Sequence, residues 1–190
     1  MTGNQALLVL LRAFHTHQIP YMVTGGYAFN FWGPPRSTKD ADIVVEAPPL
    51  DWPKILHSLP EEITLEDQLT FETITGSQRE ILRIKDSSFF IEVFHLTNDP
   101  FNQQRFQNRV SVPLFPDFEV SVARAEDVII QKLRWFHLNP SRRKDFDDAV
   151  NIFKTMPDQL QHSHIEYWCR QHNTFELLQN TLKEARSESI

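Results

Sequence analysis

The stretch VTGGYAFNFWGPPRSTKDADIVVE, residues 23–46, contains an apolar run, two glycines, a short apolar segment and a second apolar run that opens with Asp-x-Asp. Pro34-Pro35 lies between the glycine pair and the Asp-x-Asp motif. It ends the short apolar segment after the glycines, because proline lacks the amide hydrogen that would continue a helix or a sheet. We therefore expect a strand at 19–24, a short helix at 27–32 and a strand at 41–46. Two interpretations remain open at this point: a tight turn before an ordinary half-buried strand, or one site built from the glycines and the carboxylates.

The acidic motif itself favours a site. Side chains alternate along a strand, so Asp40 and Asp42 point to one face while the apolar residues between and after them point to the other. Two strand rises place these carboxylates about 6–7 Å apart. Like charges at this separation repel unless a cation or a proton intervenes, and a hard divalent cation such as Mg²⁺ or Mn²⁺ takes oxygen ligands. The alternative is a solvated strand end, since acidic pairs are common.

A third acid strengthens the first interpretation. Glu92 is the one charged residue in the otherwise apolar strand FFIEVFHL, residues 89–96, and an acid in such a strand should avoid burial unless it has a partner. If this strand neighbours 41–46, Glu92 completes a carboxylate cluster of the kind that holds two metal ions in phosphoryl transfer. The alternative is an edge-strand glutamate that faces water.

The glycine pair adds a phosphate-binding element. Gly25 and Gly26 follow a predicted strand and precede a predicted helix, where bare backbone can approach a ligand and the amides of the helix N-terminus can bind phosphate. A glycine pair alone is a weak signal. Followed by Asp-x-Asp and by a third acid on a later strand, it is a strong one.

The rest of the chain indicates an α+β fold with a mixed sheet flanked by helices. Strands and helices mix in the first two thirds, whereas helices alone follow Ala125. We expect residues 1–123 to form an α+β core and residues 124–190 a helical C-terminal subdomain packed on it. Within the core the expected helices are 4–17, 51–59 and 99–109, and the expected strands are 69–75, 80–86 and 89–96, as a meander, with 110–115 and 118–123.

The composition limits the classes of partner that we expect this protein to bind. A hydrophobic content of 41% in 190 residues is typical of a folded globular protein, and a net charge of −6 argues against extended DNA binding or an anionic membrane surface. Cys169 is the only cysteine, which excludes an internal disulfide and a cysteine-based metal cluster. With an N-terminal apolar stretch too short to span a bilayer, a reducing, cytoplasmic location is expected.

At this point the residues match a known pattern. The glycine pair, the Asp-x-Asp and the later apolar-flanked acid resemble the DNA polymerase β-type nucleotidyltransferase superfamily. The fuller string, with its Arg-x-Thr-x-Asp-x-Asp, is similar to small stand-alone members that include the AbiEii-type toxins of toxin–antitoxin systems. Such toxins carry a lysine and an aspartate on the helices after the sheet, and ARAEDVIIQKLRWF and SRRKDFDDAV match them at Lys132 and Asp145.

The resemblance implies roles for the strand and glycine residues. Gly25 and Gly26 would hold the nucleotide triphosphate. Asp40 and Asp42 would bind the metal ions. Glu92 would be the third acid, as a metal ligand or as a general base towards the acceptor hydroxyl, although a glutamate replaces the commoner aspartate there.

The resemblance also implies nucleotide contacts outside the strands. Lys132 would contact the triphosphate, Asp145 would help to shape the nucleotide pocket, and Arg36 and Thr38 would add phosphate or acceptor contacts. The basic residues around Lys132 have an alternative interpretation, in which they form a solvated helix face with neighbouring aspartates as partners.

The expected function is metal-dependent transfer of a nucleoside monophosphate from an NTP such as ATP to a hydroxyl of tRNA or of a protein, releasing pyrophosphate. An antitoxin is the expected protein partner. Two alternatives stay open: the acceptor is a small molecule such as an antibiotic, or the protein is a catalytically silent relative that binds nucleotide or a partner without turnover.

Overall fold

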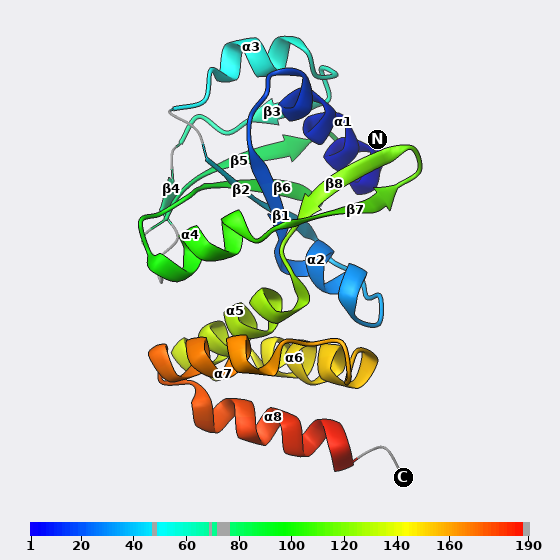
Figure 1. Cartoon of the computed structure of the whole chain (residues 1–190). Coiled ribbons are helices and arrows are strands. Elements are labelled where there is room, and N and C mark those ends of the chain that lie inside the picture. The colour runs from blue at the N-terminus through cyan, green and yellow to red at the C-terminus, as the bar shows by residue number, and fades with distance from the viewer. Residues whose placement is uncertain (47–48, 69, 72–76, 188–190) are drawn as a thin grey trace. The chain divides into compact units, whose positions relative to one another are not determined.

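The computed structural model describes residues 1–46, 49–68, 70–71 and 77–187 (Figure 1). The helices are α1 (Gly3–Thr16), α2 (Gly25–Trp32), α3 (Trp52–His57), α4 (Pro100–Gln107), α5 (Ala125–Leu138), α6 (Arg143–Thr155), α7 (His162–Gln171) and α8 (Phe175–Ser187). The strands are β1 (Tyr21–Thr24), β2 (Asp40–Val45), β3 (Ile63–Leu65), β4 (Thr70–Phe71), β5 (Gln78–Ile84), β6 (Phe90–His95), β7 (Val110–Phe115) and β8 (Phe118–Val122).

The chain divides into two compact units. One consists of Met1–Tyr27 and Ser37–Val122, and the other of Ala28–Arg36 and Ala123–Ile190. All the strands belong to the first unit, and α5 to α8 belong to the second. The division crosses α2, whose first turn belongs to the sheet-containing unit.

A mixed sheet organises the first unit. Its strand order is β3-β5-β6-β2-β1-β8-β7, and β4 pairs with β5 outside this path. β2 runs parallel to β6 and antiparallel to β1, which runs parallel to β8. Strands β2 and β6 therefore lie inside the sheet with a neighbour on each side, which explains why both are rich in buried apolar residues.

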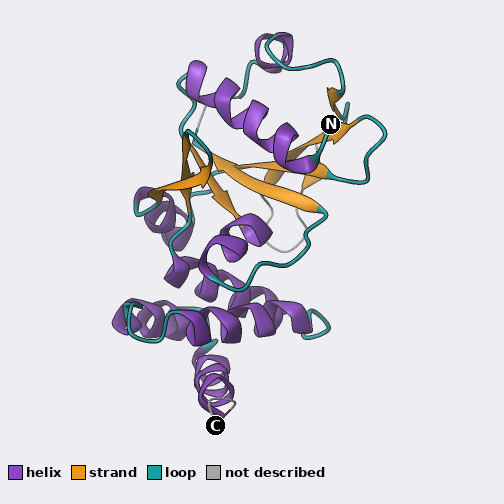
Figure 2. Ribbon diagram, turned by 90° about the vertical axis from the view of Figure 1, so that its right-hand side faces the viewer, coloured by secondary structure: helices purple, strands orange, loops and turns teal. Residues whose placement is uncertain are grey.

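Helix α1 covers one side of this sheet (Figure 2). Thr2 begins it with a capping box: its hydroxyl accepts from the Gln5 amide at 3.2 Å, and the Gln5 side chain accepts from the Thr2 amide at 2.8 Å. Its apolar face, which includes Leu7, Leu11 and Phe14, is fully buried. Each such side chain contributes about 1.5–3 kcal/mol to folding.

The second unit is built on helix packing. α5 contacts α6 and α7, and α6 contacts α8. Ile129 and Leu133 of α5 and Ala149 of α6 are fully buried. The 28–36 segment joins these helices through a hydrogen bond from Trp32 Nε1 to the carbonyl oxygen of Ala123, at 2.8 Å.

The expected fold class is confirmed: a mixed sheet flanked by helices is followed by helices alone. The meander is confirmed for β4, β5 and β6, which pair antiparallel in sequence order, although part of the expected strand 69–75 lies outside the described residues. Strand β3 was not predicted, because three residues are too few to show a period. Across the described residues, no helix combines the length and the apolar character needed to cross a membrane.

Candidate active site

The three predicted carboxylates meet on neighbouring strands inside the sheet. In the parallel pairing of β2 with β6, Asp42 is in register with Glu92 and Asp40 with Phe90. Residues in register share a face, so the two aspartates and Glu92 stand on the same side of the sheet. After burial, the negative charge of Asp42 is the next cause that raises the pKa of Glu92, as expected of neighbouring carboxylates. The predicted adjacency of these two strands is confirmed.

Glu92 is a buried acid in an unfavourable environment. Its residue is 9% exposed. Burial raises the pKa of Glu92 to about 7, the negative charge of Asp42 adds to the increase, and the guanidinium of Arg79 opposes it. A carboxyl group with a pKa near neutrality is suited to accept a proton from a hydroxyl.

Arg79 of β5 is the partner that the burial of Glu92 requires. Its Nη1 donates to Glu92 Oε1 at 2.5 Å, and its Nε donates to Thr70 Oγ1 at 3.0 Å. The sequence does not identify this partner, because GSQR at 76–79 is typical of a turn. Arg79 instead belongs to β5, beside the strand that carries Glu92.

The two glycines lie against the acidic strand. Thr24 at the end of β1 is in register with Asp42, so the turn into α2 begins beside that carboxylate. Gly25 has φ of +59°, and a Cβ atom there would overlap the Asp42 carboxylate. A Cβ atom on Gly26 would lie 2.6 Å from Thr38 Oγ1. Only glycine satisfies both the backbone conformation and the close approach at Gly25.

Thr38 holds the first aspartate. Its hydroxyl donates to Asp40 Oδ1 at 2.8 Å. On the other side, Tyr27 lies near enough to Asp40 that burial, with the charge of this carboxylate as a second cause, raises the pKa of the phenol to about 12. The Tyr27 hydroxyl donates to Asn4 Oδ1 at 2.7 Å. Direct contact of Thr38 with phosphate or acceptor stays a prediction.

Three other predicted residues meet within the helical unit. Lys132 Nζ lies 2.7 Å from Asp145 Oδ1 and 2.8 Å from Asp148 Oδ2. Arg36 clamps the same Asp148 with two hydrogen bonds, of 2.8 Å from Nε and 2.6 Å from Nη2. Arg142 Nε lies 2.5 Å from Asp145 Oδ2. The result is a chain of alternating charges with a positive group at each end.

Burial makes this network expensive to break. The side chains of Lys132, Asp145 and Asp148 are 9%, 2% and 3% exposed. Burial alone would raise the pKa of Asp145, but the charges and hydrogen bonds of Lys132 and Arg142 bring it below its usual value. The expected pairing of the basic residues with neighbouring aspartates is therefore present: Asp145 and Asp148 both form ion pairs. Contact of Lys132, Asp145 or Arg36 with nucleotide stays a prediction.

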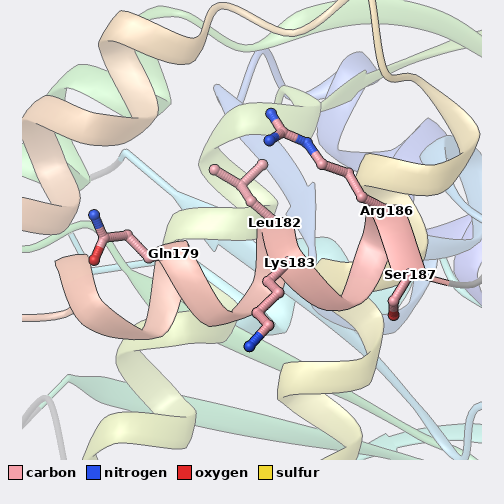
Figure 3. Close-up of a pocket in the computed structure, with 5 residues that line it drawn as sticks. All are labelled: Gln179, Leu182, Lys183, Arg186 and Ser187. Atoms are coloured by element: carbon pink, nitrogen blue, oxygen red, sulfur yellow. The ribbon is translucent and has the colours of Figure 1, made fainter.

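One hollow on the helical unit contains none of these residues. It lies along α8, where the labelled side chains all come from a single helix (Figure 3). Its lining consists of Gln179, Leu182, Lys183, Arg186 and Ser187.

Comparison with known proteins decides the family. The model of the family described as "Nucleotidyl transferase AbiEii toxin, Type IV TA system" matches residues 8–190. The chain belongs to this family. It is accordingly a nucleotidyltransferase, and the resemblance stated from the glycine and acidic motifs is confirmed. No curated protein matches the sequence.

Solved structures of nucleotidyltransferases share the fold. The crystal structure of ANT(2")-Ia in complex with adenylyl-2"-tobramycin is 11% identical, with a TM-score of 0.60, over 90% of this chain and 98% of that one. An antigenic nucleotidyltransferase-like protein from Paracoccidioides brasiliensis is 18% identical, with a TM-score of 0.57, over 94% of this chain and 92% of that one. At these identities the likeness concerns the fold alone.

The carboxylates of this AbiEii-family chain have the chemistry of a hard-metal site. Asp40, Asp42 and Glu92 offer oxygen ligands only, and a divalent cation would relieve the repulsion that, after burial, raises the pKa of Glu92. Among the residues described, no group of three or more His, Cys, Asp or Glu side chains is placed to hold a metal ion. Metal binding by these three residues stays a prediction.

Arg79, Tyr27 and Asp148 adjoin predicted site residues and were not among them. For Arg79 the available signal was the unexplained charge of Glu92. Tyr27 follows the glycine pair directly, yet nothing in an apolar segment distinguishes one aromatic residue as the neighbour of Asp40. Asp148 is one of three aspartates on α6, and the sequence does not indicate which of them are buried.

Proposed function

We propose that this nucleotidyltransferase transfers a nucleoside monophosphate from an NTP to an acceptor hydroxyl, with a divalent cation held by Asp40, Asp42 and Glu92. One observation carries the proposal: Asp42 and Glu92 are in register on adjacent parallel strands, on the face that also bears Asp40. Three carboxylates on one face of the sheet repel one another and so lower the stability of the folded protein, and a bound cation would offset this repulsion.

The glycine turn supplies the phosphate site. The N-terminus of α2 begins at Gly25, so its amides and the positive end of the helix dipole lie beside Asp42. Gly25 and Gly26 hold the triphosphate through backbone amides, and the absence of a Cβ at both positions permits the close approach.

Glu92 accepts the proton of the acceptor hydroxyl. The acceptor oxygen then forms a bond with the α-phosphorus, the bond from that phosphorus to the bridging oxygen of the β-phosphate breaks, and pyrophosphate leaves. When bound, Mg²⁺ or Mn²⁺ supplies positive charge to the phosphate oxygens during this exchange. Thr38 keeps Asp40 oriented through its 2.8 Å hydrogen bond.

Lys132, Asp145 and Arg36 complete the proposed nucleotide contacts. The charge chain in the helical unit ends in two arginines, Arg36 and Arg142, and so carries one net positive charge, which suits a polyanionic substrate. Lys132→Met is expected to raise the KM for NTP and also to lower the free energy of unfolding, because it leaves the buried carboxylates of Asp145 and Asp148 without the cation that they share.

The acceptor we favour is tRNA or a protein hydroxyl, with an antitoxin as the natural protein partner, because the family is one of toxins from toxin–antitoxin systems. A second candidate is a small-molecule acceptor. It is favoured by the fold shared with ANT(2")-Ia, which was crystallised with adenylyl-2"-tobramycin.

Two experiments test the proposal. Titration of each NTP by calorimetry, with Mg²⁺ and with EDTA, is expected to show metal-dependent binding that Asp42→Asn abolishes. Metal-independent binding, or binding that survives in Asp42→Asn, would contradict the metal site. The variant Asp51→Asn, which changes an acid that caps α3, controls for the loss of one charge.

Incubation with α-labelled NTPs then identifies the acceptor. Parallel reactions contain total tRNA, a protein extract treated with RNase, or aminoglycosides. We expect label in tRNA or protein, and label in the aminoglycoside alone would replace the first candidate by the second. No label in any reaction, from a protein that binds NTP with Mg²⁺, would overturn transfer to these acceptors.

A further inference from the structure

Two arginines of β5 lie on either side of the position that pairs with Glu92. Ile81 is the register partner of Glu92, and Arg79 and Arg83 lie two residues to either side of it. Side chains two apart on a strand share a face, so both arginines stand on the side of the sheet that bears the carboxylates. They carry the same charge at the same distance along the strand from the partner of Glu92, and Arg83 shares the register row of Phe90 and Asp40.

The two arginines nevertheless have different partners. Arg79 Nη1 is bonded to Glu92 Oε1 at 2.5 Å, and both side chains are largely buried, at 27% and 11% exposed. Arg83 Nε is bonded to Glu66 at 2.5 Å, and those side chains are 50% and 30% exposed. Arg83 also lies over the ring of Phe90, 4.9 Å from its centroid. Only the Arg79 pair involves the acidic cluster.

Arg79 is itself held in place. Its Nε donates to Thr70 Oγ1 at 3.0 Å, and Thr70 is its register partner on β4. The Arg79 guanidinium is therefore held by one bond to the Glu92 carboxylate and one to the Thr70 hydroxyl, and the charge-assisted bond to the carboxylate is the stronger of the two. Glu92 Oε1 cannot make this bond and at the same time offer the same lone pair to a metal ion.

We propose that Arg79 is the positioning residue of Glu92: its guanidinium holds the carboxylate in the metal-free protein, competes with the divalent cation for Oε1, and so sets the metal affinity of the site. The inference rests on the proposed function, since it needs a cation at Asp40, Asp42 and Glu92. The hydrogen bond between Arg79 and Glu92 breaks when the cation binds, and it forms again when the cation dissociates. Removing Arg79 therefore tightens metal binding.

The test is Mn²⁺ binding to the full chain, followed by the loss of the free-ion signal in electron paramagnetic resonance. Arg79→Gln is expected to bind Mn²⁺ about tenfold more tightly than wild type, the equivalent of one charge-assisted hydrogen bond. Arg79→Lys keeps the charge but loses the planar guanidinium that bonds to both Thr70 and Glu92, and its Mn²⁺ affinity should lie between those of wild type and Arg79→Gln. Arg83→Gln removes the same charge on the other side of Ile81 and should stay within about twofold of wild type, because exposed charges interact weakly.

The outcomes separate this inference from the proposed function. Wild-type protein that binds no Mn²⁺, or binds it equally well after Asp42→Asn, overturns the metal site and this inference with it. Wild-type protein that binds Mn²⁺ through Asp42 while Arg79→Gln binds it equally or less tightly overturns the inference alone. An equal gain in Arg79→Gln and Arg83→Gln also overturns it, since general charge then explains the effect. Circular dichroism verifies that each variant is folded, and Arg79→Lys provides the comparison if Arg79→Gln is not.

Discussion

Replacing Glu92 by glutamine should make the metal-free protein more stable at neutral pH. The pKa of Glu92 is raised from 4.5 to about 7, first by burial and then by Asp42. A group whose pKa is raised on folding contributes stability that is fully present below its unfolded pKa and is lost as pH rises through its folded pKa. For Glu92 that window extends from about pH 4.5 to about pH 7.

The size of the effect follows from the same two pKa values. The shift corresponds to about 3 kcal/mol of unfolding free energy above pH 7, against a total of about 5–15 kcal/mol for a protein of ordinary stability. The unfolding free energy of Glu92→Gln minus that of wild type should therefore increase by up to this amount between pH 4.5 and pH 8. Glutamine carries no charge to be buried or to be repelled by Asp42, and these are the two causes of the gain, burial first.

Urea unfolding of both proteins in EDTA, repeated across this pH range, measures the difference. Glu66→Gln is the control, because it removes another carboxylate paired with an arginine of β5, in a partly exposed position where such pairs contribute about 0–1 kcal/mol. The difference in unfolding free energy between Glu92→Gln and wild type should increase with pH. A difference that stays constant or decreases as pH rises would refute the raised pKa of Glu92. The variant should also lose nucleotidyl transfer, so that stability and activity change in opposite directions.

Three further substitutions test the glycine turn, the threonine and the helical network. Gly25→Ala should lower the unfolding free energy by about 2 kcal/mol and abolish transfer, because the positive φ and the overlap with Asp42 both oppose a Cβ; chemical denaturation that shows unchanged stability would contradict this. Thr38→Val should lower kcat about tenfold, since Asp40 loses its orienting hydroxyl, and Thr38→Ser, which keeps the hydroxyl, should retain most of the activity. Asp148→Asn should cost about 3 kcal/mol in denaturant unfolding, as it leaves buried Lys132 with one charged partner fewer. Asp147→Asn, on the same helix with an exposed partner, should change stability by less than about 1 kcal/mol, and equal losses in the two variants would refute the network.

Much of the fold was predictable because its signals are local. The Pro-Pro turn and the apolar alternation placed α2 and β2, and the polar cap at Asp51 began α3, where its carboxylate accepts from the Lys54 amide at 3.3 Å. The adjacency of β2 and β6 is a long-range feature, yet it followed from a simple energetic demand: a charge in an apolar strand needs a partner. The same demand applied to Arg79, which stayed hidden because its neighbours have the composition of a turn.

Other features depend on three-dimensional packing. Lys132 and Asp145 were predicted as separate nucleotide contacts, and the structure shows them bonded to each other. The sequence places them on successive helices, and their contact depends on how α5 and α6 pack. Likewise, the two hydrogen bonds from Arg36 to Asp148 join residues 112 positions apart, a pairing that no local pattern indicates.

The discontinuity of the helical unit has a practical consequence for dissecting the protein. Because residues 28–36 belong with the C-terminal helices, no single cut of the chain separates the two units. A fragment that ends at Val122 would leave Trp32 and Arg36 without the Ala123 carbonyl and the Asp148 carboxylate that accept their hydrogen bonds. Separate expression of the two halves is therefore a poor way to obtain the sheet-containing unit alone.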